Sequence, residues 1–428
     1  MSACSRAAGA PLRRRRLLQA GGAFVLGGCS RKRAGKPGRI VFKHQPLWGD
    51  PGPFRELLAR FISAHPGCEL VTEALPSSSD LAHQYFLTAL EGGAGDFDVF
   101  VMDVVWVAEL ARAGWLVDLS DTHPPASLGE ELLSGAATSV VADGRTWAIP
   151  WYVDVGLLYR RSDWFPVAPE SYDELLEQAA RARTDRGANA GYVWQGRQYE
   201  GLVCNAYEAI WGHGGETFVD GRLGLRTPKA VAAVQFLRDL IVDGASPRSV
   251  TSMAEEESRR VFQGGRAGFM RNWPYAWRAA QADDSAIRGR VGVSPLPSSD
   301  GTPGPGVLGG YQLALNVHAP AENRELALAL IEHLTSVEAQ ISLAVSYGRN
   351  PSRRAAYQDP SLQRAWPELS AILPMLERAR PRPVTAYYPM LTDMLQIELS
   401  AAVTGLRSPA EALARAQAFS DRLMGVAE

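Results

Sequence analysis

The stretch IVFKHQPLWGDPGPFRELLARFISAH, residues 40–65, decides the fold, because a short apolar strand leads directly into a segment with helical spacing. The alternation continues, with strands predicted at 69–74 and 97–102 and helices at 80–91 and 105–113. A βαβ series of this kind folds as a mostly parallel sheet with helices on both faces. Ligands bind such sheets at the carboxyl ends of the strands, so the loops that follow the strands are the first candidates for a site.

A second α/β unit is predicted to follow the first. Residues 151–160, WYVDVGLLYR, form an apolar and aromatic run that carries one acid, Asp154, which is typical of a buried strand. Two later short strands, 291–296 and 311–316, are expected to rejoin the first sheet. The chain from residue 323 is expected to be helical, with breaks at 347–351 and 381–389. Between these parts the pattern predicts four helices and one strand, at 172–183, 199–211, 228–243, 252–263 and 267–271.

The N-terminal segment resembles an export signal. Adjacent arginines, Arg13 to Arg16, precede an apolar run at 17–28 that is too short to span a bilayer. The arginines resemble a twin-arginine signal, and the sequence LGGC that ends at Cys29 resembles the lipobox at which bacteria lipidate a cysteine. We therefore expect residues 1–28 to be a signal peptide and Cys29 to carry a lipid. The protein would be exported to the periplasmic or cell-surface face of the cytoplasmic membrane.

The length and charge of the chain indicate two lobes and argue against some kinds of partner. About 400 residues follow the signal, which is too many for one hydrophobic core and suits two lobes. Residues 29–39 are basic and fit a flexible tether beside anionic lipid headgroups, or equally a solvated linker. Removal of residues 1–28 takes away five of the 44 basic residues and none of the 46 acids, so the formal charge becomes 39 − 46 = −7. This balance argues against a nucleic-acid partner, and we expect a monomer.

The sequence lacks the common catalytic and metal-binding motifs. It has no Gly-x-Ser-x-Gly elbow, no His-Glu-x-x-His pair and no Walker loop. Residues 304–309, GPGVLG, match the dinucleotide pattern by letters, but a strand-like run follows them where that motif needs a helix. His213 and Glu216 lack further ligands at metal-binding spacing, and Cys68 and Cys204 are expected to be separate thiols rather than a disulfide. The sequence predicts no catalytic residue, no metal and no cofactor.

Aromatic residues recur beside acids, glycines or an arginine at the ends of the predicted elements. This combination suits a carbohydrate, whose pyranose ring offers an apolar face of C–H groups and a rim of hydroxyls. Aromatic side chains can cover the face, while carboxylates and guanidinium groups bind the rim through charge-assisted hydrogen bonds. Trp106, Trp151 and Trp211 are assigned to the core. The groups are Trp48 with Asp50, Asp103 with Trp106, Tyr152 with Asp154, Trp273 with Tyr275 and Trp277, Gly309 and Gly310 with Tyr311, and Arg382 near Tyr387 and Tyr388.

Four segments resemble the extracellular sugar-binding receptors of ABC importers, and most closely their trehalose- and maltose-binding branch. The segments are FDVFVMDVVW at 97–106, IPWYVDVGLLYR at 149–160, FQGGRAGFMRNWPYAW at 262–277 and GGY at 309–311. The likeness runs in matching order from about residue 39 to the C-terminus. It implies a type II periplasmic-binding-protein fold, in which two α/β lobes, each a mostly parallel sheet covered by helices, hold the ligand in the cleft between them.

The resemblance also implies lobe boundaries and binding residues. The N-terminal lobe would comprise residues 40–150 and about 288–346, and the C-terminal lobe 151–287 and about 347–428. Asp50 is a candidate where the family usually has Glu, and Tyr311 stands where the family often has Trp. The residues implied by matching motifs are Asp103, Gly310 and Tyr311 from one lobe and Tyr152, Asp154, Trp273, Tyr275 and Arg382 from the other.

The function that the resemblance implies is a lipid-tethered receptor. It would capture an α-linked disaccharide such as trehalose or maltose by closure of its lobes and deliver it to the permease subunits of an ABC importer. Two alternatives stay open at this point. An exported glycoside hydrolase could use two of the carboxylates of Asp103, Asp154 and Glu208. A receptor of the same fold could instead bind a peptide or a metal chelate.

Overall fold

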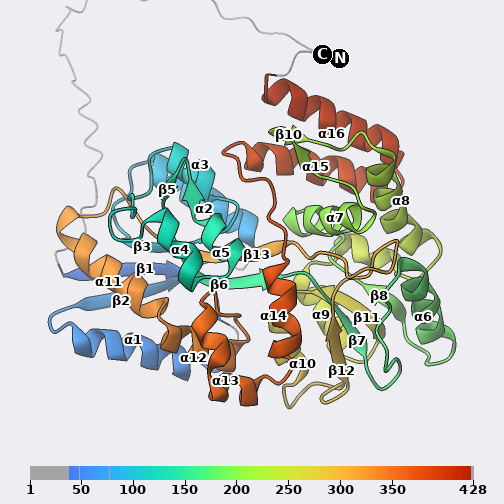
Figure 1. Ribbon diagram of the computed structural model, residues 1–428, viewed down its shortest axis with the longest axis horizontal. Coiled ribbons are helices and arrows are strands. Elements are labelled where there is room, and N and C mark those ends of the chain that lie inside the picture. The colour runs from blue at the N-terminus through green and yellow to red at the C-terminus, as the bar shows by residue number, and fades with distance from the viewer. Residues whose placement is uncertain (1–37, 48, 77, 426–428) are drawn as a thin grey trace, which may run out of the picture. The chain divides into compact units, whose positions relative to one another are not determined.

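The chain folds around two β-sheets (Figure 1). The computed structural model describes residues 38–47, 49–76 and 78–425, so the predicted signal peptide, Cys29, Trp48 and most of the predicted tether lie outside the described residues. The first sheet has the strand order β2-β1-β3-β13-β6, and the second has the order β12-β7-β11-β8. The first comprises β1 (Arg39–His44), β2 (Glu69–Ala74), β3 (Val99–Asp103), β6 (Ile149–Val155) and β13 (Leu308–Leu315). The second comprises β7 (Leu157–Arg161), β8 (Ala190–Val193), β11 (Ala267–Asn272) and β12 (Val291–Ser294).

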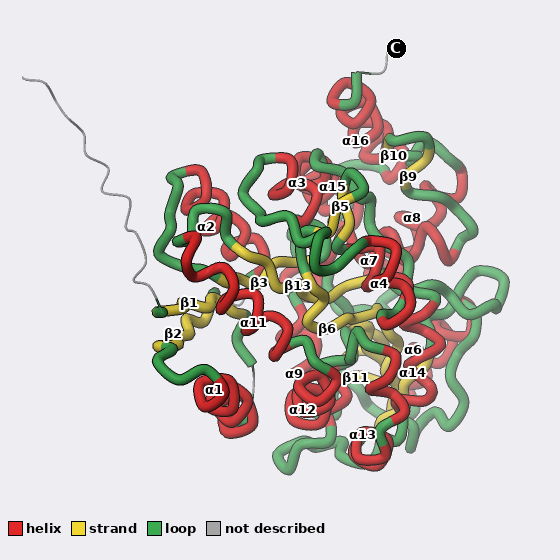
Figure 2. The backbone as a smooth tube through the Cα atoms, turned by 60° about the vertical axis from the view of Figure 1, so that its left-hand side comes forward, coloured by secondary structure: helices red, strands yellow, loops and turns green. Residues whose placement is uncertain are grey.

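Both sheets mix parallel and antiparallel pairs. β1 pairs in parallel with β2 and β3, as the βαβ pattern predicts, and β8 pairs in parallel with β11. β13 is antiparallel to β3 and β6, and β7 is antiparallel to β11 and β12. The prediction of mostly parallel sheets is therefore right for the strands from β1 to β3 and wrong for the second sheet, because β13 and β7 enter their sheets by crossing from the other one. Figure 2 shows the first sheet running from β1 and β2 to β6.

The strand predicted at 291–296 does not rejoin the first sheet. β12 pairs with β7 of the second sheet, from Val291 opposite Arg161 to Ser294 opposite Leu158. Only β13 returns to the first sheet, so the return lies near residue 308 and not near residue 288. Both segments are short and apolar, and such a pattern does not indicate which sheet a strand will join.

Helices cover both sheets (Figure 1). On the side of the first sheet lie α1 (Gly52–Ala64), α2 (Ser79–Glu91), α3 (Val107–Arg112), α4 (Pro125–Glu131), α5 (Ser134–Ser139), α11 (Arg324–Leu334) and α12 (Val337–Tyr347). On the side of the second lie α6 (Tyr172–Thr184), α7 (Glu200–Gly212), α8 (Pro228–Val242), α9 (Glu255–Gln263), α10 (Tyr275–Ala280), α15 (Tyr388–Val403) and α16 (Pro409–Leu423). The remaining elements are α13 (Pro360–Ala365), α14 (Leu369–Glu377), the hairpins β4–β5 (Val141–Ala142, Arg145–Thr146) and β9–β10 (Phe218–Val219, Arg222–Leu223), and three short 3₁₀ helices (Arg248–Ser252, Ala321–Asn323, Arg354–Gln358).

Capping side chains explain where several helices begin. In each case a Ser or Thr hydroxyl accepts a hydrogen bond from a backbone N–H of the first turn, which would otherwise lack a partner. The helices predicted at 80–91, 172–183 and 228–243 accordingly agree with α2, α6 and α8 to within one residue at each end. The caps are Ser78 of α2, Ser171 of α6, Thr227 of α8, Ser336 of α12 and Ser408 of α16.

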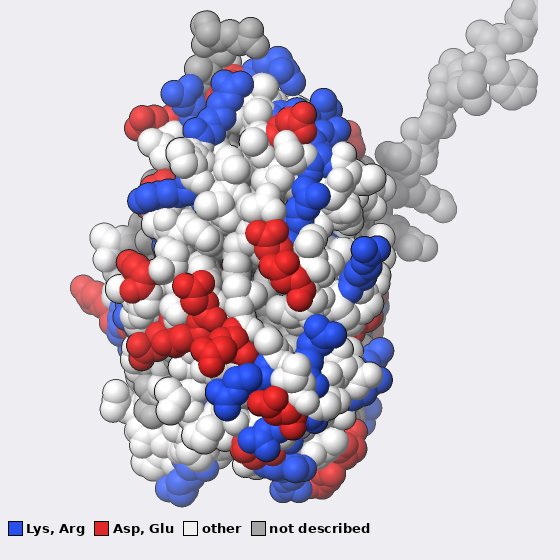
Figure 3. Space-filling model, turned by 90° about the vertical axis from the view of Figure 1, so that its right-hand side faces the viewer, with Lys and Arg blue, Asp and Glu red and all other residues white. Residues whose placement is uncertain are grey.

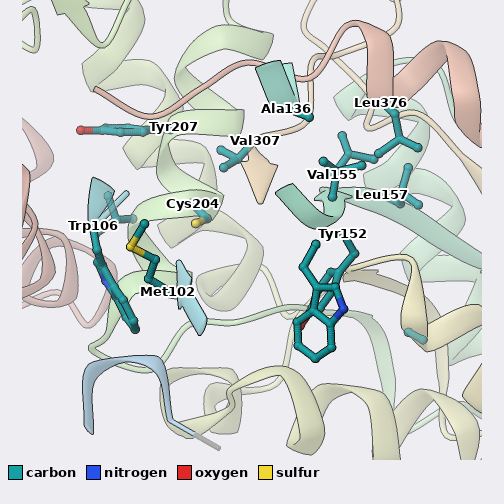
Figure 4. Close-up of a cluster of buried hydrophobic side chains, with 14 of the residues drawn as sticks. Met102, Trp106, Ala136, Tyr152, Val155, Leu157, Cys204, Tyr207, Val307 and Leu376 are labelled. Atoms are coloured by element: carbon teal, nitrogen blue, oxygen red, sulfur yellow. The ribbon is translucent and has the colours of Figure 1, made fainter. Parts of the chain in front are cut away.

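Three segments cross between the sheets side by side. Gly156 alone separates β6 from β7, so the single strand predicted at 151–160 is two strands of different sheets. The backbone N–H of Gly156 donates to the carbonyl of Val307 at 3.2 Å, and that of Leu308 donates to the carbonyl of Arg380 at 2.7 Å. The buried hydrophobic cluster in Figure 4 packs this crossing, with Val155, Leu157, Val307 and Leu376 among its members.

The surface carries charges of both signs. Figure 3 shows acidic and basic side chains interspersed on the face at the right of Figure 1. Within the described residues, no single helix is both long and apolar enough to cross a bilayer, although the segments Ala321–Leu334 and Val337–Tyr347, bent by 56°, reach that length and composition together.

Candidate ligand-binding site

A cavity of about 320 Å³ lies at the carboxyl end of β3 and is lined by strands and loops of the first sheet and by helices and loops beside the second. Its wall includes the predicted residues Asp103, Tyr152, Asp154, Trp273, Tyr275, Gly310, Tyr311 and Arg382. The remaining predicted residue, Asp50, is not part of the wall. The structure therefore brings together residues that are up to 279 positions apart in the sequence.

Strand register sets the first-sheet side of the cavity. Tyr311 of β13 lies opposite Asp103 of β3 on one side and opposite Tyr152 of β6 on the other. The rings of Tyr152 and Tyr311 have centroids 5.5 Å apart. Gly310 has φ +126°, and a Cβ there would lie 2.4 Å from the carbonyl oxygen of Tyr152, so only glycine fits. This glycine lets β13 approach β6 closely enough to align the two tyrosines.

Asp154 is a buried carboxyl group beside these tyrosines. Asp154 is a residue of β6, it is 6% exposed, and its Oδ1 has no hydrogen-bond partner. Burial raises the pKa of Asp154 to about 7, although the nearby Arg349 acts in the opposite direction. At neutral pH both the neutral and the ionised form of this carboxyl group are therefore populated, so it can either donate or accept a hydrogen bond.

Aromatic side chains form the second-sheet side. Trp273 directly follows β11, and Tyr275 begins α10. Two acids of α9 orient these rings, because Trp273 Nε1 donates to Glu255 Oε1 at 3.3 Å and Tyr275 Oη donates to Glu256 Oε1 at 2.9 Å. The rings are only partly buried and line the cavity, so they offer apolar surface to a ligand.

Arg382 joins the two sides. Its Nη2 donates to Asp103 Oδ1 at 3.1 Å, and its Nη1 donates to Glu200 Oε1 at 2.6 Å. Asp103 ends β3 of the first sheet, whereas Glu200 begins α7 beside the second. Despite burial, the surrounding groups, Asp103 and Glu200 among them, hold the pKa of Arg382 well above its usual value, so its guanidinium group is ionised.

Arg349 is a cavity residue that the sequence did not single out. Its guanidinium carbon lies 4.8 Å from the ring centroid of Tyr152 and 5.6 Å from that of Tyr275. The neighbouring Asn350 holds this loop to β6, since its carbonyl accepts a backbone hydrogen bond of 3.0 Å from Val153 and its side-chain amide donates one of 3.1 Å to the Val153 carbonyl. The only local signal was a break in the helical pattern around Gly348, which marks a loop but not its destination.

Asp50 has a local role instead of a place in the cavity. Its Oδ1 accepts a hydrogen bond from the backbone N–H of Gly52 at 2.9 Å, and its side chain is exposed. A short Asp side chain that closes this turn at the start of α1 cannot also reach the cavity. The same loop contributes Gln45 and Pro46 to the wall, which lie closer to the end of β1.

Several buried polar atoms of the wall have no partner. They include donors and acceptors from both sides of the cavity, whereas most buried polar groups in proteins are hydrogen-bonded. Among them are Gln45 Nε2, Tyr152 Oη, Asp154 Oδ1, Arg349 Nε and Arg382 Nε. Such a set is completed by a ligand that both donates and accepts hydrogen bonds at several points.

The comparisons with known proteins agree with this geometry. A family model described as bacterial extracellular solute-binding protein matches residues 46–341. The chain belongs to this family. As a solute-binding protein it is the substrate-binding component of an ABC transporter and not an enzyme, which removes the glycoside hydrolase from consideration.

Individual relatives cover most of this solute-binding protein. A probable ABC transporter-binding protein of Deinococcus radiodurans is 34% identical over 365 residues, which are 82% of this chain and 86% of the relative. The maltose-bound MalE3 of T. maritima is 38% identical, with a TM-score of 0.85 over 90% of this chain and 99% of that one. The GacH receptor of Streptomyces glaucescens, solved unliganded and with acarbose, has a TM-score of 0.80 at 23% identity over 92% and 100% of the chains, which shows the shared fold.

The sequence candidates for catalysis, a metal or a disulfide do not form such sites in the described part of this solute-binding protein. Glu208 lies outside the cavity and forms a buried ion pair with Arg271. His213 ends α7, where its Nδ1 contacts the carbonyl of Ala209. Cys68 and Cys204 are both free thiols, as predicted, and the described residues contain no cluster of side chains that could hold a metal ion.

Proposed function

We propose that this solute-binding protein captures an α-linked disaccharide such as trehalose or maltose and delivers it to the permease of an ABC importer. The observation that carries the proposal is the composition of the cavity, in which aromatic rings alternate with buried donors and acceptors that lack partners. A pyranose ring needs both kinds of surface. Trp273, Tyr275 and Tyr311 can cover its C–H faces, while Asp154 and Arg349 present an acceptor and a donor to its hydroxyls.

The size of the cavity supports a short sugar. A volume of about 320 Å³ is at the lower end of the roughly 300–1,000 Å³ found for small-molecule sites, so a long oligosaccharide would not be enclosed. The 38% identity to a maltose-bound MalE3 supports the same class of ligand. Two pyranose rings are the unit that we expect the cavity to hold.

The charge of the cavity argues against anionic solutes. Its wall carries more carboxylates than guanidinium groups, so a phosphorylated sugar would meet net repulsion. Several of these acids are engaged within the protein, since Arg382 binds Asp103 and Glu200 and Tyr275 binds Glu256. The acids of the wall are Asp103, Asp154, Glu200, Glu255, Glu256 and Glu257, and its arginines are Arg197, Arg349 and Arg382.

The proposal includes anchoring at the membrane. A lipid on Cys29 and the predicted tether at 29–39 would hold a monomeric receptor near its importer at a raised effective concentration. We expect the Cys29→Ser variant to be found in the soluble fraction after cell lysis, whereas the natural chain sediments with membranes. Membrane sedimentation of the variant equal to that of the natural chain would contradict the anchor at Cys29.

Ligand class is tested by a thermal-shift panel on the full chain. Trehalose, maltose, maltotetraose, a glucose phosphate, a tripeptide and a ferric chelate are compared, because only a true ligand stabilises the native state by RT ln(1 + [L]/Kd). We expect the disaccharides to raise the melting temperature most. A shift with the tripeptide or the chelate and none with the sugars would favour the non-sugar receptor instead.

Trp273 provides the matching mutational test. We expect Trp273→Ala to weaken binding of the disaccharide by about 2 kcal/mol, the scale for loss of a buried aromatic anchor, while the protein stays folded. Isothermal calorimetry measures the change. Trp164→Ala is the control, because Trp164 is absent from the wall of the cavity and stacks on Arg161 at 3.9 Å. Unchanged affinity in Trp273→Ala would exclude the ring as a sugar platform.

A further inference from the structure

A layer of buried polar side chains lies behind Trp273 and outside the cavity. The guanidinium carbon of Arg271 is 4.0 Å from the ring centroid of Trp273, so one face of the indole is covered by the arginine. Arg271 is fully buried, and neither it nor its partner Glu208 is part of the cavity wall. Because Trp273 does line the cavity, the ring separates this layer from the ligand.

Three hydrogen bonds to two side chains fix the guanidinium group of Arg271. Arg271 donates through Nε and Nη2 to Glu208 at 2.8 and 2.5 Å, and through Nη1 to Gln195 Oε1 at 3.2 Å. The carboxylate holds the pKa of Arg271 above its usual value despite burial, so the guanidinium group stays charged. A planar fork with this many partners has one orientation, and the ring that stacks on it shares that orientation.

Glu208 attaches this layer to the segments that cross between the sheets. Its Oε1 accepts a hydrogen bond from the backbone N–H of Val307 at 3.0 Å. A Cβ on Gly156 would lie 1.8 Å from the same oxygen, so the second crossing segment also packs directly on this carboxylate. Gly156 and Val307 are themselves joined by a backbone hydrogen bond. The crossing segments, Glu208, Arg271 and Trp273 are thus in continuous contact.

We propose that Arg271, held by Glu208, is a positioning residue that fixes the orientation of the Trp273 ring for stacking on the ligand. Replacing a buried ion pair by apolar residues of the same size is often neutral or even stabilising, so the presence of the pair behind the platform is not explained by stability and points to orientation of the ring. This inference rests on the proposed function, because it requires Trp273 to contact the sugar. It assigns a role in binding to two residues that do not touch the ligand.

The test is a double-mutant cycle with the full chain and the disaccharide identified by the thermal-shift panel. Arg271→Lys keeps the charge but removes the planar fork that stacks on the indole. We expect it to weaken binding about tenfold when Trp273 is present, and less than about twofold in the Trp273→Ala background, because the arginine acts through the ring. Calorimetry gives the four affinities, and thermal melting confirms that each variant is folded.

The outcomes separate this inference from the proposed function. Equal losses of affinity in both backgrounds would overturn the positioning role, since the arginine would then act independently of the ring. Unchanged affinity in Trp273→Ala alone would overturn the sugar platform and the positioning role together. If Arg271→Lys does not fold, Glu208→Gln is tested in the same cycle, because it keeps the shape of the carboxylate and removes its charge.

Arg161 offers a matched control. It is also buried, also stacks on a tryptophan, with its guanidinium carbon 3.9 Å from the ring centroid of Trp164, and also forms a bidentate pair, with Asp163 at 2.7 and 2.8 Å. None of these residues lines the cavity. Arg161→Lys should therefore leave the sugar affinity unchanged, and a tenfold loss there would show that such substitutions act through general stability.

Discussion

Asp154 is the cavity residue at which stability and the proposed binding of a ligand conflict most directly. A carboxyl group buried without a partner for Oδ1 destabilises the native state, and its raised pKa of about 7 records that cost. The positive charge of Arg349 offsets this cost only in part, and both Tyr152 and Arg349 have an unpartnered polar atom of their own. Such a residue is stabilised by a ligand that supplies the missing hydrogen bonds.

The pH dependence of stability follows from this shift. Between about pH 4 and pH 7 the native state keeps the proton on Asp154 and the unfolded chain releases it, so this group lowers the free energy of unfolding as pH rises. We expect unliganded Asp154→Asn to lack this slope and to be more stable than the natural protein at pH 8, by about 2 kcal/mol. Chemical denaturation at pH 5 and pH 8 measures the difference, and calorimetry should show weaker sugar binding.

Asp163 serves as a control of opposite sign. Its bidentate contact with Arg161 holds the pKa of Asp163 below its usual value, so its contribution to stability is present above the unfolded pKa and is lost as pH falls. Asp163→Asn should therefore destabilise the protein at neutral pH. If Asp154→Asn and Asp163→Asn were destabilised equally at pH 8, the conclusion that ionised Asp154 destabilises the native state would be wrong.

Most of the candidate binding residues named from the sequence line the cavity. Asp103 ends β3 and Trp273 directly follows β11, and the ends of strands are where a site is expected in such sheets, whereas Tyr311 lies within β13 and reaches the cavity through its register with Asp103 and Tyr152. Arg349 and Glu200 could not be found this way, because a loop after α12 and the first turn of α7 reach the cavity only through tertiary packing. Asp50 does not line the cavity for a local reason, because its side chain accepts a hydrogen bond within its own turn.

At the scale of the elements, the run from β6 to β7 decides how the two sheets connect. Its apolar pattern is continuous, yet it serves two sheets, with Gly156 at the boundary. Periodicity describes the burial of a strand but not the sheet to which it belongs. The same reason explains the wrong placement of β12, whereas capped helices such as α6 and α8 were predicted closely.

Gly156 should not tolerate a side chain. A Cβ would lie 1.8 Å from Glu208 Oε1 and 2.6 Å from Arg271 Nη2, and this ion pair is buried and held by several hydrogen bonds. We expect Gly156→Ala to destabilise the protein by about 3 kcal/mol, from overpacking and distortion of a buried charge pair. Chemical denaturation measures the free energy of unfolding.

Gly129 provides the comparison for this prediction. It belongs to α4, and nothing lies within 4 Å of a Cβ added there. Gly129→Ala should change stability by less than about 1 kcal/mol, with the helix propensity of Ala acting in its favour. Similar effects of the two substitutions would contradict the close packing at the crossing.

At the scale of the whole molecule, the cavity depends on the contact between the two sides. Arg382 binds an acid from each side, and the cavity wall is made of residues of the first sheet and of helices and loops beside the second. A ligand that touches both sides binds the closed arrangement better than an open one and shifts the equilibrium by that difference in affinity. Closure would then be what the transporter recognises.

Solution scattering tests this expectation. We expect the radius of gyration of the full chain to decrease when the disaccharide is added, because the open form becomes less populated. The Trp273→Ala variant at the same sugar concentration should respond less. A radius that stays constant on saturation with a sugar of measured affinity would show that binding and closure are not coupled.

The sequence by itself determined the α/β class, the two lobes, most helices and the residue types of the candidate site, because periodicity, helix caps and residue types are local properties. Only the tertiary structure decided the membership of β12, the boundary at Gly156, the arrival of Arg349 and Glu200 in the cavity and the exclusion of Asp50. These depend on contacts between residues far apart in the chain, such as Arg382 with Asp103 and Glu208 with Val307. Local sequence patterns do not predict which distant residue such a side chain will contact.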